Sequence, residues 1–244
     1  MKPVVSIIMP SYNAEKYIEI ALQSIKSQTF SLNDLEVILI DDQSTDKTLE
    51  KIDIFKKENP RFPIIIEKNP KHKDVAATRN SAMRIAEGDI FLYMDADDII
   101  PENCVYRFVR AFDKNPEVGF VYSDHAQIRA NTKGNILNED IIKVRNNKPD
   151  FEIGTFLMGD YNYIGHMKSI RSEVKIPFDE KLSYSEDSDW IINLGFNEIK
   201  FFHLQEILYF WRRGIDSIST RKSEEERGYY HNLVFQRGLN KLKL

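Results

Sequence analysis

Short apolar runs alternate with amphipathic stretches along the first half of the chain. The runs are rich in β-branched and aromatic residues and occupy Val4–Met9, Leu35–Ile40, Phe62–Glu67, Ile90–Met94 and Val118–Ser123. Between them, apolar residues recur at helical spacing, as they do after the first run at Tyr17, Ile18, Ala21, Leu22 and Ile25. This alternation predicts an α/β fold with a mainly parallel central sheet flanked by helices on both faces.

Capping residues set the predicted ends of these helices. Asn13 is placed to cap the first helix, and Pro101 to open the helix that follows the fourth strand. The third helix is expected over Asp74–Glu87, with Gly88 as the residue that ends it.

The pattern is looser after Ser123. Residues 131–150 are polar and without period, which predicts a surface loop or a long hairpin. Further strands are expected at Ile164–Arg171, Lys200–Phe202 and Ile207–Trp211, and a short helix at Ile191–Gly195. A last helix after Ser223 should pack on the rest, because exposed aromatic residues are unfavourable. No linker divides the chain, so one domain is expected over residues 1–244.

Two of the predicted strands end in carboxylates. Asp41 and Asp42 follow the second strand, and Asp95, Asp97 and Asp98 follow the fourth. Parallel strands bring their carboxyl ends to one edge of a sheet, where ligands bind in open α/β folds. Grouped aspartates repel one another unless a cation neutralises them, and oxygen ligands suit Mg²⁺ or Mn²⁺ beside phosphates. Asp97 or Asp98 could instead cap the next helix, but two acidic strand ends favour a binding site.

Composition excludes several classes of protein. A hydrophobic fraction of 42% supports a sizeable core, and a net charge of −4 gives no electrostatic basis for binding nucleic acid. The single cysteine, Cys104, excludes an internal disulfide and a thiolate metal cage and fits a reducing cytoplasm. No apolar stretch suits a signal peptide or a transmembrane segment, which predicts a cytoplasmic protein, soluble or peripherally membrane-associated.

Several short motifs are individually weak but specific in their order and spacing. They are Val5–Asn13, Ile40–Thr48, Ala77–Asn80 with Glu87–Asp89, Met94–Asp98, Phe178–Glu180, Glu186–Trp190, and Arg212 with Ser217–Ser219. With these motifs the chain resembles the inverting family 2 glycosyltransferases of the GT-A fold. The resemblance implies a Rossmann-like nucleotide-sugar-binding half at 1–123, an acceptor-binding and catalytic half at 124–222, and a C-terminal helix at 223–244.

The resemblance also implies a reaction and a donor site. A hexosyl-type sugar would pass with inversion from a nucleotide diphosphate sugar to a glycan or lipid-linked acceptor, in surface polysaccharide or glycoconjugate synthesis. Asp42 would accept a hydrogen bond from N3–H of uracil, which favours a UDP-sugar. Mn²⁺ or Mg²⁺ would be held by Asp97, helped by Asp95, and would stabilise the leaving diphosphate. The donor-contacting residues would be Pro10, Tyr12, Asn13, Asp42, Arg79, Asp95 and Ala96.

On the acceptor side, the resemblance makes Asp187 the general base of an inverting reaction. Glu186 and Trp190 would contact the acceptor, and His166 would line its pocket. The residues alone leave other interpretations open. Acids at the start of a helix also complement its dipole, and the residue type alone favours a structural histidine at His166. Tyr12 could be an ordinary half-buried tyrosine, and Arg79 a solvated ion-pair partner.

Three positions depart from the family pattern. Gln43 and Asp74 stand where glycine is frequent, and Gln43 is tolerated if its φ stays negative. Gly214 stands where many members have a histidine near the metal, so a cation should bind tightly only together with nucleotide diphosphate. Two other functions remain open: a non-catalytic nucleotide-sugar or glycan-binding domain, and a phosphatase of the haloacid dehalogenase type, whose acidic strand would lie nearer the N-terminus.

Overall fold

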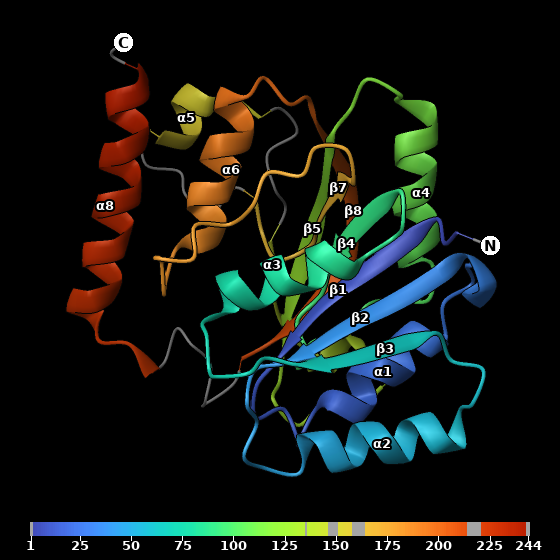
Figure 1. Ribbon diagram of the computed structural model, residues 1–244. Coiled ribbons are helices and arrows are strands. Elements are labelled where there is room, and N and C mark those ends of the chain that lie inside the picture. Colours follow the sequence, from blue (N-terminus) through green and yellow to red (C-terminus); the bar gives the residue numbers. More distant parts are fainter. Residues whose placement is uncertain (1, 135, 146–150, 158–163, 214–220, 243–244) are drawn as a thin grey trace.

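Strands and helices alternate through the first half of the computed structural model, which describes residues 2–134, 136–145, 151–157, 164–213 and 221–242. The order confirms the predicted β–α alternation (Figure 1). The elements are β1 (Val5–Ser11), α1 (Ile18–Lys26), β2 (Leu35–Asp41), α2 (Thr48–Glu58), β3 (Ile64–Lys68), α3 (Val75–Ile85), β4 (Ile90–Tyr93), α4 (Cys104–Lys114) and β5 (Phe120–Ile128).

The second half is less regular. Its elements are β6 (Ile141–Arg145), α5 (Ile153–Leu157), β7 (Lys168–Arg171), α6 (Glu186–Phe196), β8 (Phe201–Arg212) and α8 (Glu224–Leu242). β5 and β6 pair antiparallel and form a hairpin, which is one of the two options predicted for residues 131–150. The two strands expected at 200–202 and 207–211 are a single strand, β8, which shifts register against β5 midway.

One sheet joins all the strands in the order β3-β2-β1-β4-β7-β5-β6, with β8 paired to β5. β1 to β4 are mutually parallel, and β8 is parallel to β5. β7 is antiparallel to both of its neighbours, β4 and β5. The sheet is therefore mainly parallel, as predicted, with an inserted antiparallel strand at its centre.

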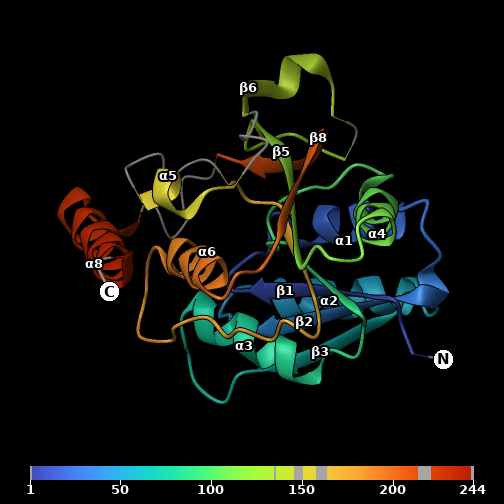
Figure 2. The same ribbon diagram turned by 90° about the horizontal axis from the view of Figure 1, so that it is seen from above.

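Helices cover both faces of this sheet and enclose two apolar clusters (Figures 1 and 2). α1, α2 and α4 pack on one face, and α3, α5, α6 and α8 pack on the other. Side chains alternate along each strand, so Ile7 and Met9 of β1 enter the first cluster while Ile8 enters the second. Both clusters hold the strands rigidly, which fixes the loops at the strand ends.

The C-terminal helix α8 packs on the second cluster. Val234 and Phe235 are buried there, which confirms the expected docking of the last helix. Tyr229, on the same helix, is 63% exposed. Among the described helices, none is long and apolar enough to cross a lipid bilayer.

Two predicted helix starts are wrong. α1 begins at Ile18, and Asn13 lies in a left-handed turn with φ of 52°, where asparagine is tolerated because its side chain bonds locally. Its Oδ1 accepts from the backbone N–H of Thr45 at 2.8 Å. α4 begins at Cys104, whose N–H donates to the Pro101 carbonyl, so Pro101 belongs to a preceding turn. Asp74 is at the N-cap position of α3 with a φ of −75°, so this position needs no glycine.

Gly88 also has a different role from the predicted one. α3 ends at Ile85 and Ala86 has extended backbone, so Gly88 does not terminate the helix. Its N–H donates to Ser6 Oγ at 2.8 Å. A Cβ at position 88 would lie 2.6 Å from both the backbone nitrogen and the Oγ of Ser6. The absence of a side chain here allows the loop before β4 to approach β1.

Replacing Gly88 with alanine should therefore destabilise the fold. The new methyl group would meet backbone atoms of Val5 and Ser6, which cannot move as a side chain can, in addition to the Ser6 Oγ. Overpacking of this kind costs about 1–3 kcal/mol. Thermal or urea unfolding measures the loss. Gly154→Ala is the matched control, since a Cβ there would meet nothing within 4 Å. Equal stability of the two variants would contradict this account of Gly88.

Candidate active site

The polar residues singled out in the sequence meet at one edge of the sheet. Because β1, β2 and β4 are parallel, their carboxyl ends bring Tyr12, Asp42 and Asp95 to this edge. β7 runs in the opposite direction, and its first residue, Lys168, pairs with Tyr93, the last residue of β4. The amino end of β7 is therefore at the same edge as the acids.

The three aspartates after β4 have different surroundings. Asp95 accepts from Arg79 Nη2 at 2.9 Å, which lowers its pKa although burial opposes ionisation. Asp98 accepts from the Tyr209 hydroxyl at 2.7 Å and from the backbone N–H of Arg212 at 2.8 Å. Asp98 thus ties the loop after β4 to β8. Neither Asp97 nor Asp98 caps α4, so that alternative is wrong.

Asp97 is the least satisfied of the three acids. Within the described residues its carboxylate forms no ion pair, and burial together with the nearby Asp95 raises its pKa to about 6. A cation relieves this kind of repulsion between carboxylates. Asp95, Asp98 and His166 also offer ligand atoms within 4.8 Å of one another. The chemistry of this edge fits a hard divalent ion.

Arg79, on α3, bridges two acids that lie far apart in the sequence. Its Nη2 donates to Asp95 Oδ1 at 2.9 Å, and its Nη1 donates to Glu186 Oε1 at 2.8 Å. Its side chain is only 11% exposed, so the solvated ion pair considered from the sequence is not what the structure shows. The guanidinium instead links the end of β4 to the start of α6.

Asp187 lies in the first turn of α6 and is partly open to solvent. Its Oδ2 accepts from Lys168 Nζ at 2.9 Å, and its Oδ1 accepts from the backbone N–H of Ser188 at 2.8 Å. Burial opposes ionisation of Asp187, but the Lys168 ammonium, aided by Arg79, holds its pKa well below the usual range. Sequence reasoning missed Lys168, because the strand that carries it, Lys168–Arg171, also contains Ser169 and Arg171 and so gives no sign of a buried lysine.

His166 and Trp190, the other predicted acceptor residues, differ in depth. The His166 ring is accessible and stacks against Tyr209 and Trp211, at centroid distances of 5.9 and 5.1 Å. Trp190 is fully buried and donates from Nε1 to the Ile176 carbonyl. It packs against Tyr93 in the second apolar cluster. Trp190 has no surface with which to contact an acceptor, so that prediction is corrected.

Pro10, Tyr12 and Ala96, which were predicted to contact the donor, differ in exposure. Pro10 is inside β1, and Tyr12 follows it with a ring that is 37% exposed. The ring lies 4.6 Å from that of His72 and 5.6 Å from the Arg221 guanidinium. Ala96, between the acids of β4, is buried in the first apolar cluster. Of these three residues, Tyr12 is therefore the one with an exposed aromatic surface.

Asp42 is a buried carboxylate with several donors around it. Asn69 Nδ2 donates to Oδ1 at 2.7 Å, and the backbone N–H of Lys73 donates to both oxygens. His72 Nδ1 lies 2.9 Å from Oδ2, and its side chain is 53% exposed. His72 was not found from the sequence, because the loop between β3 and α3 carries no pattern that points to Asp42.

Gln43 does not meet the condition set for it from the sequence. Its φ is 68°, in the left-handed region that glycine adopts without cost. Its Nε2 donates to the Asn69 carbonyl, which anchors the strained residue beside Asp42.

Gly214 and Ser217–Ser219 lie outside the described residues. Arg212 is buried, and its Nη1 donates to the carbonyls of Ala130 and Thr132.

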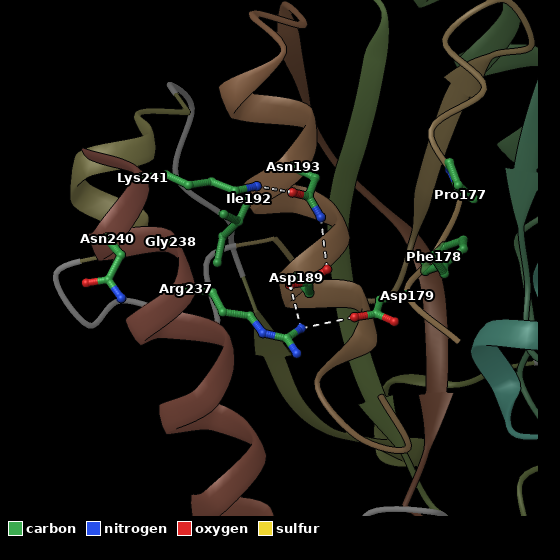
Figure 3. A pocket seen from close by; sticks show the side chains of 10 residues that line it. All are labelled: Pro177, Phe178, Asp179, Asp189, Ile192, Asn193, Arg237, Gly238, Asn240 and Lys241. Atoms are coloured by element: carbon green, nitrogen blue, oxygen red, sulfur yellow. Dashed lines mark hydrogen bonds and ion pairs between the residues drawn. The ribbon is translucent and has the colours of Figure 1, made fainter. Parts of the chain in front are cut away.

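A separate pocket of about 510 Å³ lies between α6, α8 and residues 177–179 (Figure 3). Arg237 of α8 donates to Asp179 at 3.0 Å, and Lys241 donates to Asn193 at 2.6 Å (Figure 3). None of the residues predicted for the site lines this pocket. Its ion pairs fasten α8 to the body of the fold.

Comparison with known proteins gives consistent results. Residues 6–172 match the family described as glycosyl transferase family 2. An uncharacterized glycosyltransferase, MJ1057, of Methanocaldococcus jannaschii is 30% identical over 94% of this chain and 78% of its own length. Chondroitin synthase of Pasteurella multocida is 28% identical over 99% of this chain, which spans only 24% of that enzyme.

Solved structures share the fold at lower sequence identity. Staphylococcus aureus TarS 1–349 in complex with UDP-GlcNAc superimposes with a TM-score of 0.75 and 22% identity, over 96% of this chain and 65% of its own. The mannosyltransferase PcManGT of Pyrobaculum calidifontis, in complex with GDP-Man and Mn²⁺, gives 0.71 and 18%, over 98% of this chain and 65% of its own. These similarities confirm the GT-A fold predicted from the sequence.

Proposed function

Because the chain belongs to glycosyl transferase family 2, we propose that it transfers a sugar from a UDP-sugar to an acceptor hydroxyl with inversion. The acceptor is a glycan or lipid-linked glycan, and the product belongs to a surface polysaccharide or glycoconjugate. Chondroitin synthase among the relatives and the UDP-GlcNAc complex of TarS support this reading.

The Arg79 bridge is the observation that carries the proposal. One guanidinium contacts both Asp95, the predicted donor residue, and Glu186, the neighbour of the predicted base. A sugar bound at Asp95 would thus have a carboxylate of α6 on its other side. An inverting transfer needs this arrangement, since the acceptor attacks from the face opposite the leaving group.

Each residue of the site then has a defined task. Asp187 takes the proton from the acceptor hydroxyl as its oxygen attacks the anomeric carbon and the bond to the diphosphate breaks. Glu186 contacts the acceptor, and the accessible His166 lines its pocket. Tyr12 stacks on the base, with Pro10 and Asn13 shaping the turn beside it. Arg79 is close enough to Asp95 to serve the diphosphate, a role that would require it to change partners.

A divalent ion fits the end of β4. Asp97, with no ion-pair partner in the described part of the chain, and Asp95 would hold Mn²⁺ or Mg²⁺. Such an ion supplies Lewis-acid stabilisation of the charge that develops on the leaving diphosphate. The Mn²⁺ complex of PcManGT supports an ion of this class.

Base selectivity is expected at Asp42. Its oxygens already accept from Asn69, Lys73 and His72, and the half-exposed His72 is the partner that a base can replace. Uracil offers N3–H at that position, whereas cytosine offers a lone pair that leaves the carboxylate unpaired. UDP should bind at least about tenfold more tightly than CDP. Calorimetric titration of both nucleotides checks this. Equal affinities would show that Asp42 does not select the nucleotide base.

The function itself is tested by sugar release. The protein is incubated with UDP-sugars and Mn²⁺, with and without oligosaccharide acceptors, and free UDP and glycosylated product are quantified. Acceptor-dependent release with formation of product supports a transferase. Tight UDP-sugar binding without release in any combination would favour the non-catalytic alternative. Family membership already argues against a haloacid dehalogenase-type phosphatase.

A further inference from the structure

Lys168 is a buried lysine at the centre of the fold. It is the first residue of β7, paired with Tyr93 of β4 on one side and Tyr122 of β5 on the other. Its side chain is 8% exposed. An ammonium group at such depth is unfavourable unless an anion compensates it. A core strand position of this kind ordinarily carries an apolar side chain, so the lysine calls for a specific reason.

The compensating anion is Asp187. Lys168 Nζ lies 2.9 Å from Asp187 Oδ2, and within the described residues this is its ion pair. The Asp187 side chain, at 40% exposed, still faces solvent. With Ser188 N–H bound to Oδ1, both oxygens are held and the plane of the carboxylate is fixed. Other titratable groups that interact with this pair are Arg79 of α3, Glu186 of α6, Asp95 after β4 and His166 before β7.

We propose that Lys168 is a positioning residue that orients the Asp187 carboxylate toward the acceptor hydroxyl. This inference rests on the proposed role of Asp187 as general base. In the transfer step the hydroxyl oxygen bonds to the anomeric carbon, the anomeric carbon–diphosphate bond breaks, and the hydroxyl proton moves to Asp187. Lys168 keeps its own proton throughout. It fixes the place from which the base acts, because its backbone is paired with β4 on one side and β5 on the other.

The experiment compares Lys168→Met with Lys168→Arg. Methionine fills the buried volume without the charge, and arginine restores a cation that can reach Asp187. Loss of orientation at a reacting group costs on the order of 10- to 100-fold in rate. We expect kcat of Lys168→Met to fall by that factor while the KM for UDP-sugar and the Kd for UDP stay within about twofold. Lys168→Arg should recover most of the rate.

Lys51→Met is the matched control, because Lys51 forms an ion pair with Glu19 on α1, away from the site. It should leave kcat unchanged. Thermal unfolding, measured on every variant, shows that each one is folded, independently of its UDP affinity. An unchanged kcat in Lys168→Met would overturn the proposal. So would a tenfold loss of UDP affinity, which would place Lys168 against the donor diphosphate.

A double variant separates this inference from the proposed base. If Lys168 acts through Asp187, then adding Lys168→Met to Asp187→Asn should cause no further loss of rate. A further tenfold loss would show that Lys168 acts on another group. If Asp187→Asn alone keeps most of the transfer rate, then the base assignment fails, whatever the result for Lys168.

Discussion

Replacing Asp187 with asparagine should lower the transfer rate on the order of 10²–10⁴-fold. The substitution keeps the size of the side chain and its place in the first turn of α6, but it removes the group that receives the proton. UDP affinity should stay near that of the unmodified protein, because Asp187 is hydrogen-bonded to Lys168 and Ser188 and not to Asp95 or Asp42. Single-turnover transfer assays and calorimetry measure the two quantities separately.

Asp189→Asn is the control for this substitution. Asp189 lies in the same helical turn and is buried. It accepts a hydrogen bond from Asn193 and contacts none of the acids at the carboxyl ends of β2 and β4. Its loss removes one acid from the helix start without touching the proposed base, so the rate should change little. A rate for Asp187→Asn within a few-fold of that for Asp189→Asn would refute the assignment of the base.

Replacing Asp97 with asparagine should remove the effect of metal on nucleotide binding. One or two carboxylates hold Mn²⁺ weakly until the phosphates of a nucleotide complete its coordination. Metal should therefore raise the affinity for UDP, and UDP the affinity for metal, by the same factor. In Asp97→Asn that coupling should disappear, and transfer should fall on the order of 10²–10³-fold through lost stabilisation of the leaving diphosphate. UDP titrations with and without Mn²⁺ measure the coupling.

Asp89→Asn provides the comparison, since Asp89 is an exposed acid just before β4, at the opposite end of that strand. It should retain the full effect of metal. Tight Mn²⁺ binding to the nucleotide-free protein would show that a further residue completes the metal site. His166, which offers a ligand atom near those of Asp95 and Asp98, is the candidate. A UDP affinity indifferent to Mn²⁺ in the unmodified protein would contradict a metal-assisted transfer.

Residues at the ends of parallel strands were the most predictable part of the site. An apolar run that stops at an acid fixes both the strand and the edge where the acid lies, so Asp42 and Asp95 were correctly brought together. Lys168 could not be placed in this way, because it opens an antiparallel strand inserted between β4 and β5. The sequence does not state the direction of such a strand, and the direction decides which end reaches the site.

Depth was the second quantity that the sequence did not provide. Trp190 comes directly after the acids of α6, and an exposed tryptophan ring can stack on a sugar. Its ring is instead buried in the second apolar cluster. Asparagine and proline are both common at helix starts, but Asn13 and Pro101 lie in turns that their hydrogen bonds stabilise. Propensity identified the kind of local structure, and contacts distant in sequence chose among the options.

The antiparallel insertion of β7 also determines how the molecule can move and unfold. β7 spans only Lys168–Arg171, yet it supplies the backbone hydrogen bonds that connect β4 to β5. The strands that precede Asp42 and Asp95 therefore belong to the same continuous hydrogen-bonded sheet as β5, β6 and β8. Closure around substrates is then left to loops and side chains. A destabilising substitution in β7 would therefore reduce the cooperativity of unfolding of the entire sheet, and its effect would not stay local.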